Sequence, residues 1–314
     1  MTATARRQAR ICRERYLAGF GGELDIVVVG QIARDIVLLV DELPGARAAA
    51  DVRERRELLG GKGANQAVAC AQLGASVALL GVVGDDEVGT ALLAQARADH
   101  IDVVCVVHRP EGRTALIVNV VERGGAWRYL EDFAGTELTE AEVEGARGTL
   151  VAASSVIVQL QQPAALAAAT IARDAGRRVV LDGAPPADQR ADLLATADVV
   201  RADAKEAALL TGSRMDSVDT AVRAARSVLA EGPSMVALAV EAEGDLFAWP
   251  DGHVFIPYTA DPTVDTTGAG DSLIAALTVA LTRGESPEAA ARAAAAAAGS
   301  TVGHLGGRPA LGRA

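Results

Sequence analysis

A segment near the C-terminus places an aspartate directly after a glycine turn. The segment is Val264-Asp-Thr-Thr-Gly-Ala-Gly-Asp271, and a mostly apolar helical run follows it. A glycine turn that opens a helix points unpaired backbone N–H groups and the positive end of the helix dipole at one spot, which suits a phosphate group. Asp271 is either an N-cap or a base facing that phosphate. Because Gly268, Ala269 and Gly270 clear space that a cap does not need, the pattern favours a catalytic base.

A second glycine-rich segment, Gly60-Gly-Lys-Gly-Ala-Asn-Gln66, opens a predicted helix over 64–73. It is not a phosphate-binding P-loop, because Lys62 is followed by Gly63 rather than by Ser or Thr. A turn that only caps a helix would explain the glycines but not Asn65. We therefore expect a hinge that lets the backbone approach a ligand closely, with Asn65 facing a cleft.

Composition excludes several classes of protein. The net charge of -11 repels nucleic acid and anionic membranes, and the most apolar stretch, 289–298, is too short to span a bilayer. The three cysteines, Cys12, Cys70 and Cys105, lack metal-ligand spacing, and their odd number argues against a disulfide framework. We therefore expect a cytoplasmic protein with no nucleic-acid or membrane partner.

Short β-branched runs alternate with helical runs rich in Ala, Leu and Arg along most of the chain. This alternation predicts a mostly parallel sheet with helices on both faces. The expected strands are 25–30, 77–83, 155–160, 179–182, 199–200 and 235–240, and the expected helices are 64–73, 89–99, 163–175, 204–211 and 218–231.

Two regions, 36–58 and 103–130, break this alternation with patterns that suggest antiparallel strands. A small accessory sheet is marginal on its own, so it must bury one face over a ligand or against a second subunit. A lid and a dimer interface both remain open. We expect one domain over 23–314, preceded by an arginine-rich and poorly ordered tail over 1–22.

These segments resemble the ribokinase, or pfkB, family of carbohydrate and nucleoside kinases, over about residues 24–309. The likeness is carried by GGKGANQA at 60–67, LGASVALLGVVGDDEVG at 73–89 and VDTTGAGDS at 264–272. The resemblance implies a three-layer α/β/α core with a mostly parallel sheet and a small β-sheet lid, often shared across a homodimer. It also implies transfer of the ATP γ-phosphoryl group, with Mg²⁺, to a terminal hydroxyl of a small sugar.

The resemblance also implies roles for single residues. Asp271 would take the proton of the acceptor hydroxyl while the N–H groups of 268–270 hold the transferring phosphate. Asp35 would bind two sugar hydroxyls, although a turn residue or cap is the alternative. Gln161 stands where ribokinase itself has Glu, and an amide that donates as well as accepts favours another pattern of sugar oxygens. The implied acceptor contacts are Asp35, Gly61, Lys62, Asn65 and Gln161.

The nucleotide side departs from the family pattern. The Asn-x-x-Glu element is Asp203-Ala-Lys-Glu206 here, and its Glu206 would organise Mg²⁺ through water. Asp203 adds a carboxylate beside the triphosphate, which Mg²⁺ or Lys205 must offset. The expected nucleotide loop keeps only Gly244, preceded by Val240, and we interpret the glutamates between them as a solvated loop.

A monovalent cation such as K⁺ is a further candidate ligand. Ala310 stands where family members complete the cation shell with a Ser hydroxyl, which weakens this expectation. The implied ligands are Asp265, Thr267 and the backbone carbonyls of Thr301, His304 and Gly306.

Two other functions remain open from the sequence. A nucleoside kinase would need aromatic groups in the lid to stack a base, and Trp127 and Tyr129 fall in the second lid region. A non-catalytic sugar or nucleotide sensor on the same fold would explain the altered nucleotide loop. Asp271 counts against the sensor, because binding alone needs no base there.

Overall fold

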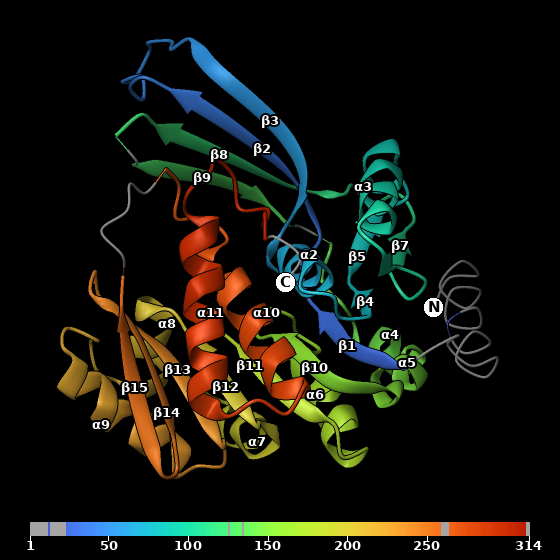
Figure 1. Cartoon of the computed structure of the whole chain (residues 1–314). Helices are drawn as coiled ribbons and strands as arrows, with labels where there is room; N and C mark the ends of the chain where they lie inside the picture. Colours follow the sequence, from blue (N-terminus) through green and yellow to red (C-terminus); the bar gives the residue numbers. More distant parts are fainter. Residues whose placement is uncertain (1–11, 13–22, 125, 134, 259–263, 312–314) are drawn as a thin grey trace.

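The computed structural model of the chain describes residues 12, 23–124, 126–133, 135–258 and 264–311. Its core is a nine-stranded sheet in the order β15-β14-β13-β12-β11-β10-β1-β4-β6 (Figure 1). All neighbours from β13 to β6 pair in parallel, and β14 and β15 complete one edge as an antiparallel hairpin. The strands are β1 (Leu24–Val29), β4 (Val77–Leu80), β6 (Ile101–Asp102), β10 (Ala153–Gln159), β11 (Arg178–Asp182), β12 (Val199–Ala202), β13 (Met235–Val240), β14 (Gly244–Trp249) and β15 (Gly252–Pro257).

Helices cover both faces of this sheet, so its strands are buried on two sides. In β1, for example, Val27 and Val29 pack into one apolar core while Ile26 and Val28 pack into the other. A central parallel strand therefore reads as a continuous apolar run. One face carries α4 (Glu140–Gly145), α5 (Arg147–Ala152), α6 (Ala165–Asp174), α7 (Arg190–Thr196), α8 (Ala204–Thr211) and α9 (Val218–Leu229); the other carries α2 (Lys62–Gln72), α3 (Glu87–Ala98), α10 (Ala269–Thr282) and α11 (Pro287–Thr301).

A second sheet of four strands, in the order β3-β2-β8-β9, projects from the core (Figure 1). We call it the lid sheet. Its outer pairs are antiparallel, as expected, but β2 and β8 are parallel, which corrects the sequence prediction. The chain passes through α2 and α3 between β2 and β8, and such a crossover is what a parallel pair requires. The strands are β2 (Ala33–Val40), β3 (Val52–Gly60), β8 (Ala115–Glu122) and β9 (Trp127–Asp132).

The predicted fold class, a mostly parallel sheet between helices with a small separate sheet, is confirmed. Some elements were not predicted. The hairpin β14–β15 and the short helices α4, α5 and α7 lack a strong periodic signal, and β7 (Val107–Arg109) pairs with β5 (Val82–Gly84) rather than with the lid sheet. The predicted tail over 1–22 lies outside the described residues, except for Cys12. Every helix in the described ranges is too short or too polar to cross a membrane.

The expectation that the cysteines are unpaired is wrong for two of them. Cys12 and Cys105 form a disulfide, with Cα atoms 5.3 Å apart, and Cys70 is free and buried. Both bonded sulfurs lie against the hydroxyl of Thr149, at 3.4 and 3.1 Å. The two cysteines are 93 residues apart in the sequence, so their pairing depends on tertiary packing that spacing does not reveal.

The start of α2 is pressed against the end of β1. A Cβ on Gly63 would lie 2.6 Å from the backbone carbon of Gly30, and the N–H of Ala64 donates to the carbonyl of Gln31 at 3.1 Å. This close approach of two backbones fixes where the helix enters the carboxyl edge of the sheet. The carboxyl edge of a parallel sheet is the usual place for a ligand site.

We therefore expect Gly63→Ala to lower the free energy of unfolding by about 1–3 kcal/mol, because the added methyl group forces backbone apart. Gly299→Ala is the matched control, since Gly299 is an exposed residue of α11 with no neighbour near its Cβ position. This control should gain about 0.5–1 kcal/mol. Urea unfolding measures both variants. Equal stability of the Gly63 variant and the parent chain would contradict the packing described here.

Candidate active site

Asp271 lies at the start of α10, and the structure shows that it is not the N-cap of this helix. The N-cap of α10 is Gly268, with φ 75°, and no side chain of the described residues caps this helix. Asp271 is 6% exposed, and its carboxylate accepts hydrogen bonds from Asn65 Nδ2 at 3.2 Å and Gln66 Nε2 at 3.1 Å. The carboxylate is therefore oriented by α2 and does not cap its own helix.

The ionisation of Asp271 depends on its charged neighbours. Burial raises the pKa of Asp271 to about 6, and the carboxylate of Asp182 adds to the rise. Lys62, Asn65 and Arg201 oppose it. A carboxylate with this pKa is ionised at neutral pH and accepts a proton more readily than an ordinary aspartate, as a general base requires.

The glycine turn Gly268–Gly270 is packed tightly from behind. A Cβ on Gly268 would lie 2.0 Å from the carbonyl oxygen of Gly307, and a Cβ on Gly270 would lie 2.2 Å from Nη2 of Arg201. Ala269 is the first residue of α10. Because the first N–H groups of a helix have no partner inside it, this turn presents donors and the positive end of the helix dipole to an anion.

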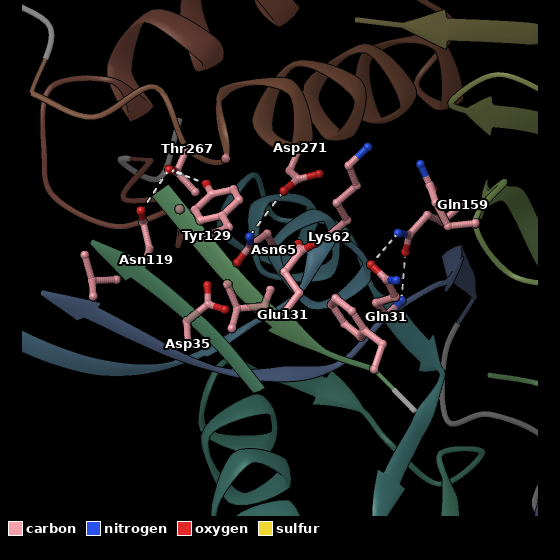
Figure 2. A pocket seen from close by; sticks show the side chains of 17 residues that line it. Gln31, Asp35, Lys62, Asn65, Asn119, Tyr129, Glu131, Gln159, Thr267 and Asp271 are labelled. Atoms are coloured by element: carbon pink, nitrogen blue, oxygen red, sulfur yellow. Dashed lines mark hydrogen bonds between the residues drawn. The ribbon is translucent and has the colours of Figure 1, made fainter. Parts of the chain in front are cut away.

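A cavity of about 340 Å³ lies between the starts of α2 and α10 and the inner face of the lid sheet (Figure 2). It brings together predicted residues that are far apart in the sequence. Those that line it are Asp35, Gly61, Lys62, Asn65, Gln161, Thr267, Gly268 and Asp271, together with Gln31, Val37, Ile117, Asn119, Tyr129, Glu131, Phe133, Gln159 and Gly307.

Asp35 comes from β2 and shares one row of the lid sheet with Ile117 and Glu131. Its carboxylate fills the space beside Gly60, where a Cβ would lie 2.1 Å from it. Burial raises the pKa of Asp35 to about 7, and the charges of Asp271 and Glu131 add to the rise. Asp35 is therefore a buried acid whose ionised form lacks a compensating cation nearby.

Three acceptor atoms at the cavity have no hydrogen-bond partner within the described part of the chain. They are Oδ1 of Asp35, Oδ1 of Asn65 and Oδ1 of Asn119, and the three residues are 2–6% exposed. A buried acceptor without a partner is costly, so we expect a water or a ligand to donate to each of these oxygens. These oxygens suit a ligand that brings several hydroxyl donors.

The lid sheet contacts the segment before α10 through polar side chains. The hydroxyls of Tyr129 and Thr267 lie 2.7 Å apart, and Asn119 Nδ2 donates to Thr267 Oγ1 at 3.3 Å (Figure 2). Trp127 stacks on Tyr129 with ring centroids 4.4 Å apart. The cavity is thus closed on the lid side by contacts to the residues that lead into the glycine turn.

A cluster of opposite charges lies on the other side of Asp271. Lys62 Nζ donates to Glu206 Oε1 at 3.0 Å and lies 3.9 Å from Asp182. Arg201 Nη1 pairs with Asp182 at 3.1 Å, and Gln66 links Asp182 to Asp271 by donating to both. Burial disfavours the ammonium of Lys62, but Asp182 and Glu206 outweigh this and raise its pKa.

Gln161 was predicted to bind the acceptor, and its placement is less direct. The residue lines the cavity, but it is exposed and its Nε2 lies 3.3 Å from Glu206 Oε1. The buried amide at this edge is Gln159, which accepts from the N–H of Gln31 and donates to the Gln31 side chain, both at 2.8 Å. Gln159 therefore fixes the backbone that follows β1.

Asp203 and Glu206 form a capping box at the start of α8. Asp203 Oδ1 accepts from the N–H groups of Lys205 and Glu206, and Glu206 Oε2 accepts from the N–H of Asp203 at 2.9 Å. The carboxylate of Asp203, which stands where the family has Asn, therefore stabilises the start of α8 as its N-cap. Glu206 is predicted to hold Mg²⁺ through water, and it sits where its Oε1 already attracts a cation, the ammonium of Lys62.

Val240 and Gly244 face each other across the β13–β14 hairpin, outside the cavity. The turn between them, 241–243, is exposed, and Glu241 pairs with Arg214 at 2.7 Å. The solvated loop expected from the sequence agrees with this geometry. Asp203, Val240 and Gly244 all lie at the carboxyl edge of the core sheet, beside Glu206.

Asp265 is the centre of the region proposed for a monovalent cation. It is 1% exposed, and it accepts from the N–H groups of Thr267 at 2.9 Å and Gly306 at 3.0 Å. Thr301 is buried in α11, and the Nε2 of His304 has no hydrogen-bond partner among the described residues. The loop 301–306 therefore packs around Asp265. Its backbone carbonyl oxygens are the kind of ligand that binds K⁺ in proteins.

Sequence reasoning missed several residues at this site. Gln66 lies inside a recognised motif, so its type and helix position could have indicated that it faces Asp271. Asp182 ends a predicted strand of the parallel sheet and Arg201 directly follows another, which is a weaker signal. Glu131 and Asn119 are found only once the register of the lid sheet is known.

Comparison with known proteins gives one consistent result. A profile of the pfkB family carbohydrate kinases matches residues 23–311. A bifunctional ribokinase/ribose-5-phosphate isomerase A from Fructilactobacillus sanfranciscensis is 32% identical over 257 residues, which cover 80% of this chain and 47% of that protein. The chain thus spans about half the length of that relative.

Two relatives match over nearly their whole length. The ribokinase of Bacillus subtilis is 31% identical over 292 residues, which cover 91% of this chain and 96% of that protein. The structure of Arabidopsis thaliana ribokinase complexed with ribose and ATP is 25% identical, has a TM-score of 0.77, and is matched over 93% of this chain and 96% of that one.

We expect Asp35→Asn to raise the melting temperature by about 2 °C or more at pH 8. The native pKa of Asp35, about 7, lies above the value of 3.8 for a free side chain, so the native state loses stability as pH rises towards 7. A neutral amide at position 35 removes this loss of stability, so the gain in melting temperature should shrink towards pH 4. Calorimetry against pH tests this, with the exposed Asp51→Asn as control. An advantage that does not change with pH would contradict the assignment.

Proposed function

The chain belongs to the pfkB family of carbohydrate kinases, and on that premise we propose that it transfers the γ-phosphoryl group of ATP to a terminal hydroxyl of a small sugar. The observation that carries this proposal is the carboxylate of Asp271. It is buried, held by two amides, raised in pKa, and placed where the cavity meets the glycine turn.

The geometry supports a simple course for the reaction. The acceptor hydroxyl lies in the cavity and gives its proton to the carboxylate of Asp271 as its oxygen attacks the γ-phosphorus. The bond from the γ-phosphorus to the bridging oxygen of the β-phosphate breaks, and ADP leaves with that oxygen. The N–H groups of the turn 268–270 hold the charge of the transferring group. Phosphoryl transfer passes through a loose transition state, so positioning and charge stabilisation contribute more than a strong base. Mg²⁺ held through water by Glu206 would neutralise charge on the phosphates.

The cavity supports a sugar over a nucleoside as the acceptor. Its unpartnered oxygens on Asp35, Asn65 and Asn119 need donors, and a polyhydroxylated ring supplies them at several positions. Tyr129 has its hydroxyl bound to Thr267 and its ring stacked with Trp127, so that pair is already engaged. Phe133 is the remaining aromatic group at the cavity.

The outer face of the lid sheet supports a homodimer. Side chains alternate along a strand, and those next to the cavity residues point away from it. On this outer face Ile36, Leu38, Val118 and Val120 are only partly buried, and Leu130 is 68% exposed. A second copy of this chain would cover these apolar side chains, and the charged Glu57, Arg55 and Arg128 on the same face could pair across the interface.

Two further assignments rest on the same premise. Backbone carbonyls of Thr301, His304 and Gly306 around Asp265 would hold K⁺, which then activates the enzyme without touching the acceptor. The need for ATP supports a cytoplasmic location, although the Cys12–Cys105 disulfide is more typical of an oxidising compartment.

Asp271→Asn should fold, bind nucleotide and acceptor, and lose turnover by at least about 100-fold, because it removes both the base and its charge. The measurement is coupled ATP turnover against pentoses, hexoses and nucleosides, with Asp219→Asn, in the first turn of α9, as the control. Near-normal turnover by Asp271→Asn would overturn the mechanism. Sugar binding without turnover in the parent chain would favour a sensor, and turnover confined to nucleosides would reassign the acceptor.

Leu130→Glu should convert a dimer into a monomer in light scattering after size-exclusion chromatography, because it places a charge in the proposed interface. Leu209→Glu is the matched control, since Leu209 is 79% exposed on α8, away from the lid sheet. The proposal is wrong if the parent chain is a monomer or if both variants behave alike.

A further inference from the structure

Arg201 is a buried cation that the course of reaction above does not use. It is the third residue of β12, and its side chain is 11% exposed. Its Nη1 lies 3.1 Å from Asp182 Oδ1 and 3.8 Å from Glu206 Oε2. The hydrogen bond to Asp182, the ion pair with Glu206 and the burial of the side chain together hold the guanidinium in place.

The guanidinium of Arg201 lies directly behind the glycine turn. A Cβ added to Gly270 would lie 2.2 Å from Nη2, 2.7 Å from Cζ and 2.9 Å from Nη1 of Arg201. Gly270 immediately precedes Asp271, so this cation is also close enough to lower the pKa of that carboxyl. The absence of a side chain at position 270 is what allows the approach.

Negative side chains gather at this edge of the sheet, so the positive charge of Arg201 is important there. Burial disfavours the charge of Arg201, but the carboxylates of Asp182, Glu206 and Asp203 outweigh this effect and raise its pKa. The charge of Arg201 in turn lowers the pKa of Asp245 and Asp271. A nucleoside triphosphate would add further negative charge here. Lys62 is engaged by Glu206, and the glutamates of the turn 241–243 provide no positive charge.

We propose that Arg201 is the fixed positive charge behind the anion-binding turn, where it stabilises the transferring phosphoryl group of the bound triphosphate. The inference rests on the proposed kinase function. Arg201 acts across Gly270, so it is a positioning residue and Asp271 remains the base. Asp182 keeps the guanidinium of Arg201 in place, and Gln66 donates to both Asp182 and Asp271. The base and the cation are therefore held in fixed positions relative to each other.

Nucleotide binding tests the inference without any acceptor. Titration calorimetry would compare Mg·AMP-PNP, a triphosphate analogue, with Mg·ADP. For Arg201→Gln we expect affinity for the triphosphate to fall about 10-fold or more, with a smaller change for the diphosphate. Arg201→Lys keeps the charge and should lose less. Arg292→Gln, which removes an exposed arginine of α11, is the control and should match the parent chain.

Turnover gives a second readout with whichever sugar the parent chain phosphorylates. Arg201→Gln should lower kcat about 100-fold, leave KM for the sugar unchanged, and shift the acid limb of the pH profile upwards, because the carboxyl of Asp271 loses a favourable charge. The groups that face Asp271 are Lys62, Asn65, Gln66 and Asp182 besides Arg201, and Asp35 and Tyr129 across the cavity. Asp35, with a pKa of about 7, titrates in the same range in parent and variant, so the comparison between them isolates the shift at Asp271.

The single variant leaves Asp182 buried without its partner, so a double variant separates folding from function. Arg201→Gln with Asp182→Asn replaces the ion pair by two amides and should restore stability and bring the pH profile back. If kcat and triphosphate affinity stay low in the double variant, the proposal stands. If both recover, Arg201 only balances Asp182 and the proposal is overturned.

Failure of the inference differs from failure of the kinase proposal. Without kinase function the parent chain would turn over no acceptor, whatever residue stands at 201. A parent chain that turns over a sugar, with Arg201→Gln equal to it in kcat and in affinity for Mg·AMP-PNP, would overturn the inference alone.

Discussion

Two buried carboxylates, those of Asp182 and Asp271, both accept a hydrogen bond from the amide of Gln66, and the charge of Asp182 raises the cost of ionising Asp271. Burial of like charges is tolerated only where cations and donors compensate it. Arg201 and Lys62 provide the positive charge, and Asn65 and Gln66 provide the donors. The starts of α2 and α10, the ends of β11 and β12, and the tight glycine contacts all place these groups within reach of one another.

The lid sheet is subject to a different constraint, the burial of unpaired acceptor oxygens. Its inner face carries Asp35, Asn119 and Glu131, whose oxygens lack partners or add negative charge, so it is unfavourable until a donor-rich ligand is present. The same strands carry Tyr129, whose hydroxyl contacts Thr267 just before the glycine turn. Under the proposed function, the strands that would bind the acceptor are therefore the same strands that contact the segment leading into the glycine turn.

Local sequence determines much of this arrangement, and the parts that it misses are long-range. The glycine motifs predict where α2 and α10 begin, and the apolar runs predict the parallel strands, because both signals lie within a few neighbouring residues. The Gln66–Asp182 contact joins residues 116 positions apart, and the parallel pairing of β2 with β8 depends on a crossover. The same is true of the Cys12–Cys105 pair. Short helices such as α7 carry too few periodic positions to be recognised.

The glycine contacts also set limits on how the protein can change through evolution. Gly30, Gly63, Gly268 and Gly307 meet other backbone atoms, so almost any substitution there must move a strand or a helix. The inner face of the lid sheet meets the cavity mainly through side chains, so a substitution there need not move a strand or a helix of the core. Under the proposed function, a change of acceptor would therefore cost less structural adjustment in the lid sheet than at the glycine contacts of the core.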